Sequence, residues 1–139
     1  MALLAHLPVG KTLLISIAIA AFLVYVPFIV VAYGRMQVGY DISAPRALFD
    51  KLPPFAQRAT WAHQNSFESF MVFAAAALMA YVTQQTSVWV GLAAIAYLVA
   101  RLLFSVFYIA NIPLGRSLMF GVGSLCITTL FLFSLLSPS

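Results

Sequence analysis

Four long runs of apolar residues divide the chain, and polar segments separate them. The runs cover residues 12–33, 56–82, 87–109 and 114–136. Each has the length of about 20 residues that an α-helix needs to cross the hydrocarbon core of a bilayer. The pattern therefore predicts an all-α integral membrane protein with four transmembrane helices. Pro27 lies inside the first run and is expected to kink that helix.

The polar segments between the runs differ in length. Residues 34–55 form the one substantial loop, which is rich in Gly and Pro, whereas residues 83–87 and 111–115 are short turns. Pro113 is placed to start the last helix. Connections this short make neighbouring helices antiparallel, so we expect an up-down four-helix bundle that forms a single domain over residues 1–139.

The composition excludes a soluble domain. Hydrophobic residues make up 64% of the chain and charged residues 7%, whereas a soluble surface needs about 25–35% charged residues. Cys126 is the only cysteine, so neither an intrachain disulfide nor a paired-thiol redox site is possible, and we interpret it as a buried, inert thiol. The first eleven residues lack the pattern of a cleaved signal peptide, because Lys11 follows the first apolar residues.

The charge distribution predicts the orientation in the membrane. The chain has seven Lys and Arg residues and three Asp and Glu residues, which gives a net charge of +4. The cations are scattered among apolar runs, which argues against a nucleic-acid partner. Five of them fall at one predicted membrane face: Arg35, Arg46, Lys51, Arg58 and Arg116. The positive-inside rule places loop 34–55 in the cytoplasm and both termini outside, as we expect for a protein of the bacterial inner membrane.

One face of the second run carries unusual polar residues. They follow each other in steps of three, four and three: Arg58, Trp61, Asn65 and Glu68. This spacing keeps them on one side of a helix, and it carries Glu68 about 15 Å from Arg58 along the axis. A lone carboxylate there is costly, and Arg101 of the third run has a similar predicted depth. We infer an intramembrane Glu68–Arg101 pair, although such a pair could serve only to fix the helix register.

The cytoplasmic halves of the predicted helices collect the polar side chains of the chain. They are Arg35, Arg58, Asn65, Glu68, Arg101, Tyr108 and Arg116. An excess of cations over a single carboxylate suits a small anionic ligand bound between helices. Asn65 could instead only hydrogen-bond a neighbouring helix. His63 faces away from Asn65 and is interpreted as an interfacial histidine, and no other ligand at a metal-binding spacing accompanies it, so no metal site is predicted.

Three motifs resemble those of a known family. RATWAHQNSFE (58–68) places Arg, Ala, Asn and Glu in order, RLLFSVFY (101–108) pairs Arg with Tyr, and PLGRS (113–117) puts an Arg at a helix start. In this order and on these spans they resemble MAPEG, the membrane-associated proteins in eicosanoid and glutathione metabolism. The resemblance implies a left-handed four-helix bundle that assembles as a homotrimer. It also implies that glutathione, as a co-substrate, binds in a U-shaped form between neighbouring subunits near the cytoplasmic side.

The resemblance also implies roles for individual residues. The predicted glutathione-binding residues are Arg35, Arg58, Asn65, Glu68, Arg101 and Tyr108. Among them, Asn65 and Glu68 would hold the peptide backbone and the amino group. Arg116 matches the family's catalytic arginine, which stabilises the glutathione thiolate. A guanidinium at a helix start favours a thiolate because both groups present positive charge.

Two positions depart from the family pattern. Members that bind glutathione well usually carry a second Arg four residues before the Asn, where this chain has Trp61. Some members have a Tyr four residues after the arginine of the last helix, where this chain has Phe120. Arg58, one turn before Trp61, is a candidate to replace the missing cation.

Three functions are compatible with these features. The first is a glutathione-dependent membrane transferase or peroxidase that acts on lipophilic electrophiles or lipid hydroperoxides, which enter from the membrane lipids. The second is a non-catalytic lipid-binding or scaffold protein of the same fold. The third is a proton or ion carrier that uses Glu68, but it would need a relay of polar residues in the outer half of the helices, where few are present.

Overall fold

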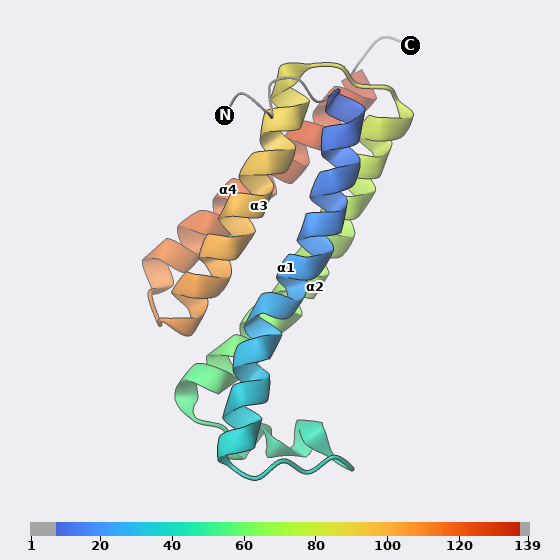
Figure 1. Ribbon diagram of the computed structural model, residues 1–139. Coiled ribbons are helices and arrows are strands. Elements are labelled where there is room, and N and C mark those ends of the chain that lie inside the picture. Colours follow the sequence, from blue (N-terminus) through green and yellow to red (C-terminus); the bar gives the residue numbers. More distant parts are fainter. Residues whose placement is uncertain (1–7, 137–139) are drawn as a thin grey trace.

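The computed structural model describes residues 8–136. Within them the chain forms four long α-helices, α1 (Val9–Gln37), α2 (Pro54–Val82), α3 (Val88–Ile109) and α4 (Pro113–Leu136). A 3-10 helix, η2 (Pro45–Lys51), lies in the connection between α1 and α2. Consecutive helices run in opposite directions (Figure 1), which confirms the predicted up-down bundle. All four helices are long and apolar enough to cross a membrane.

The observed helices extend beyond several of the apolar runs. The first run was predicted at 12–33, but α1 begins at Val9 and continues through Pro27 to Gln37. Likewise, α2 begins at Pro54, two residues before the second run. Apolar character marks the part of a helix that lies in hydrocarbon, whereas backbone hydrogen bonds continue the helix into the interface, where polar residues such as Arg35 are tolerated.

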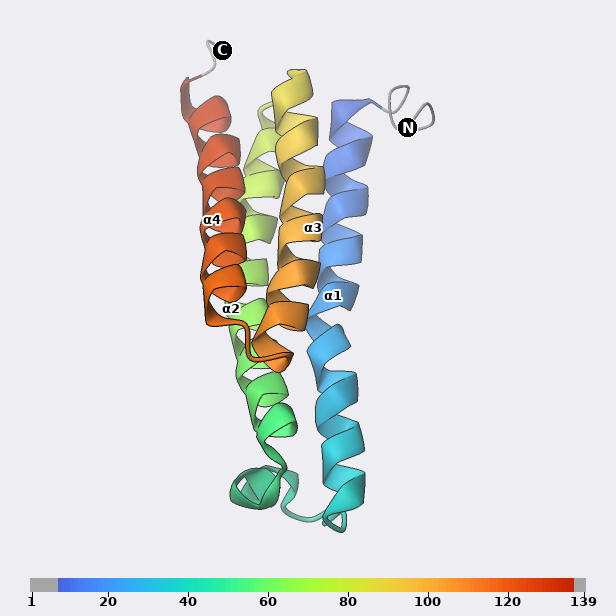
Figure 2. The same cartoon turned by 90° about the vertical axis from the view of Figure 1, so that its left-hand side faces the viewer.

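The two hairpins of the bundle differ in length. Helices α1 and α2 each have 29 residues, whereas α3 has 22 and α4 has 24. The α1–α2 hairpin therefore projects beyond the turn between α3 and α4 (Figure 2). We call this end of the bundle, with η2 and the α3–α4 turn, the loop end. The start of α1 and the end of α4 lie at the opposite end (Figure 1).

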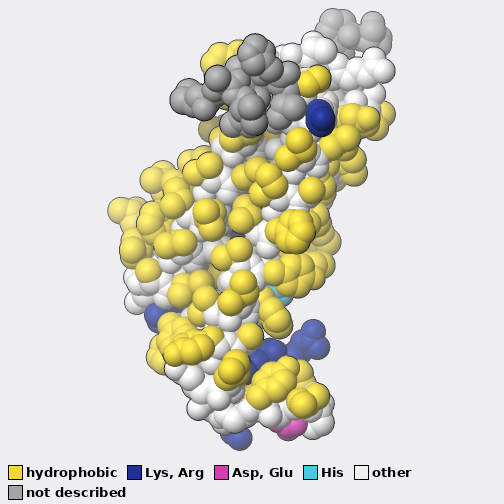
Figure 3. Space-filling view, in the orientation of Figure 1, with side chains coloured by type: hydrophobic (Ala, Val, Ile, Leu, Met, Phe, Trp, Pro, Cys, Tyr) yellow, Lys and Arg dark blue, Asp and Glu magenta, His cyan; other side chains and the backbone are white. Residues whose placement is uncertain are grey.

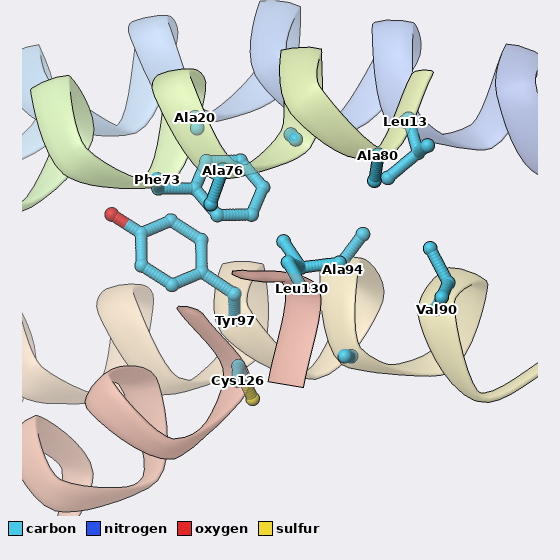
Figure 4. Packing of buried hydrophobic residues seen from close by; sticks show 12 residues of the cluster. Leu13, Ala20, Phe73, Ala76, Ala80, Val90, Ala94, Tyr97, Cys126 and Leu130 are labelled. Atoms are coloured by element: carbon cyan, nitrogen blue, oxygen red, sulfur yellow. The ribbon is translucent and has the colours of Figure 1, made fainter. Parts of the chain in front are cut away.

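The interior combines one aromatic stack with many small residues. The rings of Phe73 and Tyr97 are parallel, with centroids 3.8 Å apart, and the Tyr97 hydroxyl is 2.9 Å from Ser69 Oγ. Leu13 of α1 and Leu130 of α4 pack in the same cluster (Figure 4). The buried face of α2 is otherwise mostly alanine: Ala56, Ala59, Ala62, Ala76, Ala77 and Ala80. Such small side chains let helices approach closely, as membrane bundles require.

The outer surface of the bundle is apolar. Large side chains such as Phe22 (79% exposed) and Leu125 (67%) point outward. The space-filling view shows hydrophobic side chains over the length of the helices, with most of the visible Lys and Arg side chains near the loop end (Figure 3). A surface of this kind is unfavourable in water and suits contact with lipid or with other subunits.

Candidate ligand-binding site

A pocket of about 830 Å³ lies between α1, η2 and α2 at the loop end. Its polar wall comes from all three elements: Arg35, Tyr40, Arg46, Thr60, His63, Gln64 and Glu68. Its apolar wall is mainly aromatic and branched: Phe28, Val31, Pro45, Phe49, Leu52 and Phe67. The size and the mixture of apolar walls with a few polar groups are typical of a site for a small organic molecule.

The charged groups of this pocket are not paired with one another. Within residues 8–136, Arg46 and Glu68 form no ion pair or hydrogen bond. The buried Nε of Arg35 also lacks a hydrogen-bond partner there, and its guanidinium carbon lies 5.8 Å from the centre of the Phe28 ring. Two cations and one carboxylate thus line the pocket without a hydrogen bond or ion pair to the described residues, which leaves these groups available to a charged ligand.

The structure gives His63 a defined orientation in the pocket. Its Nδ1 lies 2.8 Å from the carbonyl oxygen of Val24 on α1, and the rings of Tyr25 and Phe28 flank it at 5.8 and 5.3 Å. A carbonyl only accepts hydrogen bonds, so Nδ1 carries the proton and Nε2 is the acceptor in the neutral ring. The sequence suggested only an interfacial role for His63, whereas it lines the pocket.

A second polar cluster lies where α2, α3 and α4 meet at the loop end. Arg58 donates a hydrogen bond from Nε to the carbonyl oxygen of Ile109, at 2.9 Å. The guanidinium carbon of Arg116 lies 4.5 Å from the centre of the Tyr108 ring, within the range of a cation–π contact. Arg58 and Arg116 therefore both have partners at the C-terminal end of α3, and neither lines the α1–η2–α2 pocket.

Arg101 lies in the interior of the bundle, and the inferred Glu68–Arg101 pair is wrong for the described residues. Arg101 is 4% exposed, and its Nη2 donates to Asn65 Oδ1 at 3.0 Å and to Ser66 Oγ at 3.1 Å. Its guanidinium carbon lies 4.1 Å from the centre of the Phe104 ring. Glu68 is exposed and faces the pocket instead. The two residues had similar predicted depths along the helix axes, but the rotation of α2 turns Asn65 and Ser66, not Glu68, toward Arg101 of α3.

The predicted site residues thus fall into three groups within one chain. Arg35 and Glu68 line the pocket. Arg58, Tyr108 and Arg116 form the second cluster, and Asn65 and Arg101 bond to each other inside the bundle. Sequence reasoning missed the pocket residues Arg46, Thr60 and Gln64. It counted Arg46 only as a topology charge, because nothing in the sequence showed that the long loop folds back beneath α1 and α2.

Four antiparallel apolar helices, each long enough to cross a membrane, define an integral membrane protein of the four-helix-bundle class. The sequence model of the MAPEG family matches residues 12–136. The chain therefore belongs to the MAPEG family. No curated protein and no solved structure matches it significantly.

Proposed function

We propose that this protein is a glutathione-dependent transferase or peroxidase that acts on lipophilic electrophiles or lipid hydroperoxides. Membership in the MAPEG family supports a membrane function of the glutathione-transferase or eicosanoid type. In this proposal it works as a homotrimer in a bacterial inner membrane, with the loop end in the cytoplasm. Its partners are glutathione, the membrane lipids and the apolar substrate that these lipids deliver.

The main support for this proposal is that two polar clusters lie apart from each other within one chain. The pocket holds Arg35 and Glu68, whereas Tyr108 and Arg116 lie at the junction of α3 and α4. A thiolate-stabilising arginine and a ligand-holding pocket are useful only if one ligand reaches both. A homotrimer would achieve this by placing the pocket of one subunit beside the Tyr108–Arg116 cluster of the next, so the active site would form between subunits.

The contact between Asn65 and Arg101 supports a defined role for Asn65. Its Oδ1 accepts from Arg101, which fixes the orientation of the side-chain amide. The two N–H groups of Asn65 then remain available as donors, and a peptide carbonyl is the acceptor that they suit. In this proposal Asn65 holds the glutathione backbone, and Arg101 is a positioning residue that acts through Asn65.

Arg116 would supply the chemistry. Its guanidinium lies on the Tyr108 ring near the start of α4, where the positive end of the helix adds to its charge. A thiol bound there loses its proton more readily, because both groups favour the thiolate. In conjugation, the thiolate sulfur forms a bond to the electrophilic carbon, and the leaving group departs with the bonding electron pair. The apolar walls of the pocket and the apolar outer surface suit a substrate that arrives from the bilayer.

A non-catalytic lipid-binding or scaffold protein remains the second candidate, because of the two departures from the family pattern. Trp61 stands where glutathione-binding members usually have an Arg, and Phe120 where some have a Tyr. Arg58, the candidate replacement, is engaged with Ile109. A protein that had lost thiol activation would keep the Asn65–Arg101 contact for its fold alone.

Glutathione binding separates the two candidates. We expect millimolar glutathione to raise the thermal unfolding temperature of the detergent-solubilised protein, and thiolate absorbance at about 240 nm to appear on binding. The matched control is ophthalmic acid, the glutathione analogue with a methyl group in place of the thiol, which should stabilise the protein without the absorbance. Insensitivity of the protein to both ligands would favour the scaffold.

A further inference from the structure

The pocket contains a cation that the sequence motifs did not point to. Arg46 lies in the first turn of η2 and lines the pocket with Arg35 of α1 and Glu68 of α2. Within residues 8–136 it has no hydrogen bond or ion pair. It therefore supplies a second guanidinium without a hydrogen bond or ion pair, and it comes from a different element than Arg35 and Glu68.

The backbone that carries Arg46 is held in place although the side chain is exposed. Pro45 begins η2 and restricts its φ angle. Leu48 and Leu52 are buried, at 7% and 5% exposure. Gln57 of α2 donates from Nε2 to the carbonyl oxygen of Phe49 at 3.3 Å. A side chain on an anchored backbone loses less conformational freedom when it binds a ligand, so its contact is stronger.

The entry to η2 is ordered as well. Ser43 donates from its backbone N–H and from its hydroxyl to Asp41 Oδ1, at 2.9 and 2.6 Å. These bonds form a turn closed by the aspartate side chain directly before Pro45. The hydrogen bond from the Ser43 hydroxyl also lowers the pKa of the Asp41 carboxyl group.

Trp61 contacts η2 rather than the pocket. It does not line the pocket, and its ring lies 5.7 Å from that of Phe49, centre to centre. Trp61 stands at the position where the family resemblance implies a ligand-binding arginine. Its ring instead packs against Phe49 of η2, the short helix that carries Arg46. The cation missing from α2 is present on η2.

We propose that Arg46 binds one carboxylate of the tripeptide ligand in place of the absent arginine at position 61, and that Trp61 is a positioning residue that acts through Phe49. This inference rests on the proposed glutathione function. Charge complementarity supports it, because glutathione at neutral pH carries two carboxylates and one ammonium group, and the pocket offers Arg35, Arg46 and Glu68.

The test pairs a variant with ligands that lack one carboxylate. The ligands are glutathione, its glycine ethyl ester, and 4-aminobutyryl-cysteinyl-glycine, which lacks the α-carboxylate. We expect Arg46→Ala to weaken glutathione binding about tenfold or more, as measured by calorimetry in detergent. One of the two analogues should lose nothing further in this variant, because the group that Arg46 binds is already absent.

Three further variants test whether the effect comes from Arg46 itself and whether Trp61 acts through Phe49. Lys51→Ala removes the cation at the other end of η2, which does not line the pocket, and should change the affinity by less than about twofold. Trp61→Ala should weaken glutathione binding with the same preference among the ligands as Arg46→Ala, whereas Trp61→Phe, which keeps a ring against Phe49, should not.

The outcomes distinguish the inference from the function on which it rests. If the unmodified protein binds glutathione, but Arg46→Ala weakens all three ligands equally or none of them, the role of Arg46 is refuted while the glutathione function stands. If the unmodified protein binds no glutathione, both are refuted. The thermal unfolding temperature without ligand should be the same for Arg46→Ala and the unmodified protein, which excludes a general loss of structure as the cause.

Discussion

Arg101 Nη2 donates a hydrogen bond to Asn65 Oδ1 across the α2–α3 interface, at 3.0 Å. Arg101 is 4% exposed, and within residues 8–136 no carboxylate pairs with it. Its partners are neutral oxygens, those of Asn65 and Ser66. The bond serves both groups, because it partly satisfies a buried cation and leaves the amide N–H groups of Asn65 free to bind a ligand.

Two substitutions at Asn65 should separate its structural role from its binding role. Asn65→Ala removes an acceptor from Arg101 and should lower the free energy of unfolding by about 1–3 kcal/mol. Asn65→Asp keeps an oxygen for Arg101 but has no N–H, so it should retain stability and lose glutathione affinity. Denaturant unfolding in detergent and calorimetry measure the two effects. Equal glutathione affinity in Asn65→Asp and the unmodified protein would contradict the proposed role.

Glu68 and Arg101 should behave as independent sites. Because Glu68 faces the pocket and Arg101 faces Asn65, the changes Glu68→Gln and Arg101→Met should add in their effect on unfolding, within about 0.5 kcal/mol. A double-mutant cycle measures this directly. A coupling well above that value would mean that the two side chains meet after all, as the sequence had suggested.

Gly34 of α1 packs tightly against Ala56 of α2. A Cβ at this position would overlap the Cβ of Ala56, and neither helix backbone can yield without separating the hairpin. Gly34→Ala should therefore cost about 1–3 kcal/mol of stability, as overpacking does. The control is Gly121→Ala in α4, where no atom lies within 4 Å of the added carbon. That change should be neutral or should stabilise by up to about 1 kcal/mol, because alanine favours helix. Equal unfolding temperatures for the two variants would contradict this account of the contact.

Arg116 distinguishes the enzyme from the scaffold. Arg116→Ala should remove most conjugation with a model electrophile and abolish the thiolate absorbance of bound glutathione, while binding weakens less. The reason is that the guanidinium favours the thiolate over the thiol rather than holding the whole tripeptide. The control is Lys11→Ala, near the start of α1 and far from the loop end, and it should leave turnover unchanged. Turnover of Arg116→Ala at the rate of the unmodified protein would refute the proposed catalytic role.

The orientation in the membrane can be tested with reporters. Five of the seven cations lie at the loop end or in its neighbouring turns, and positive charge is retained on the cytoplasmic side. A reporter that is active only in the cytoplasm should be inactive when fused after Ser139 and active when inserted after Gly39, in the α1–α2 connection. The reverse pattern would invert the proposed topology.

Much of the architecture was determined by the sequence alone. Four apolar runs of membrane-spanning length, separated by two short turns and one long loop, leave an up-down bundle as the simplest arrangement. The reason is physical: inside a bilayer each segment must satisfy its own backbone hydrogen bonds, so an apolar run of that length forms a helix regardless of its neighbours. The motifs around Asn65, Arg101 and Arg116 likewise indicated the MAPEG family, which the family match confirms.

The partners of individual side chains were decided only by the tertiary structure. Glu68 and Arg101 had similar predicted depths, but depth does not specify how each helix is rotated about its axis, and that rotation directs Arg101 to Asn65. In the sequence, Arg46 is one cation among several in a loop. Only the structure shows that it lies in η2 and lines the pocket with residues of α1 and α2. Helical periodicity acts over neighbouring turns of one segment, whereas contacts between distant segments depend on how whole helices and loops pack. For this reason the sequence determined the helices, and the packing determined which charges share the pocket.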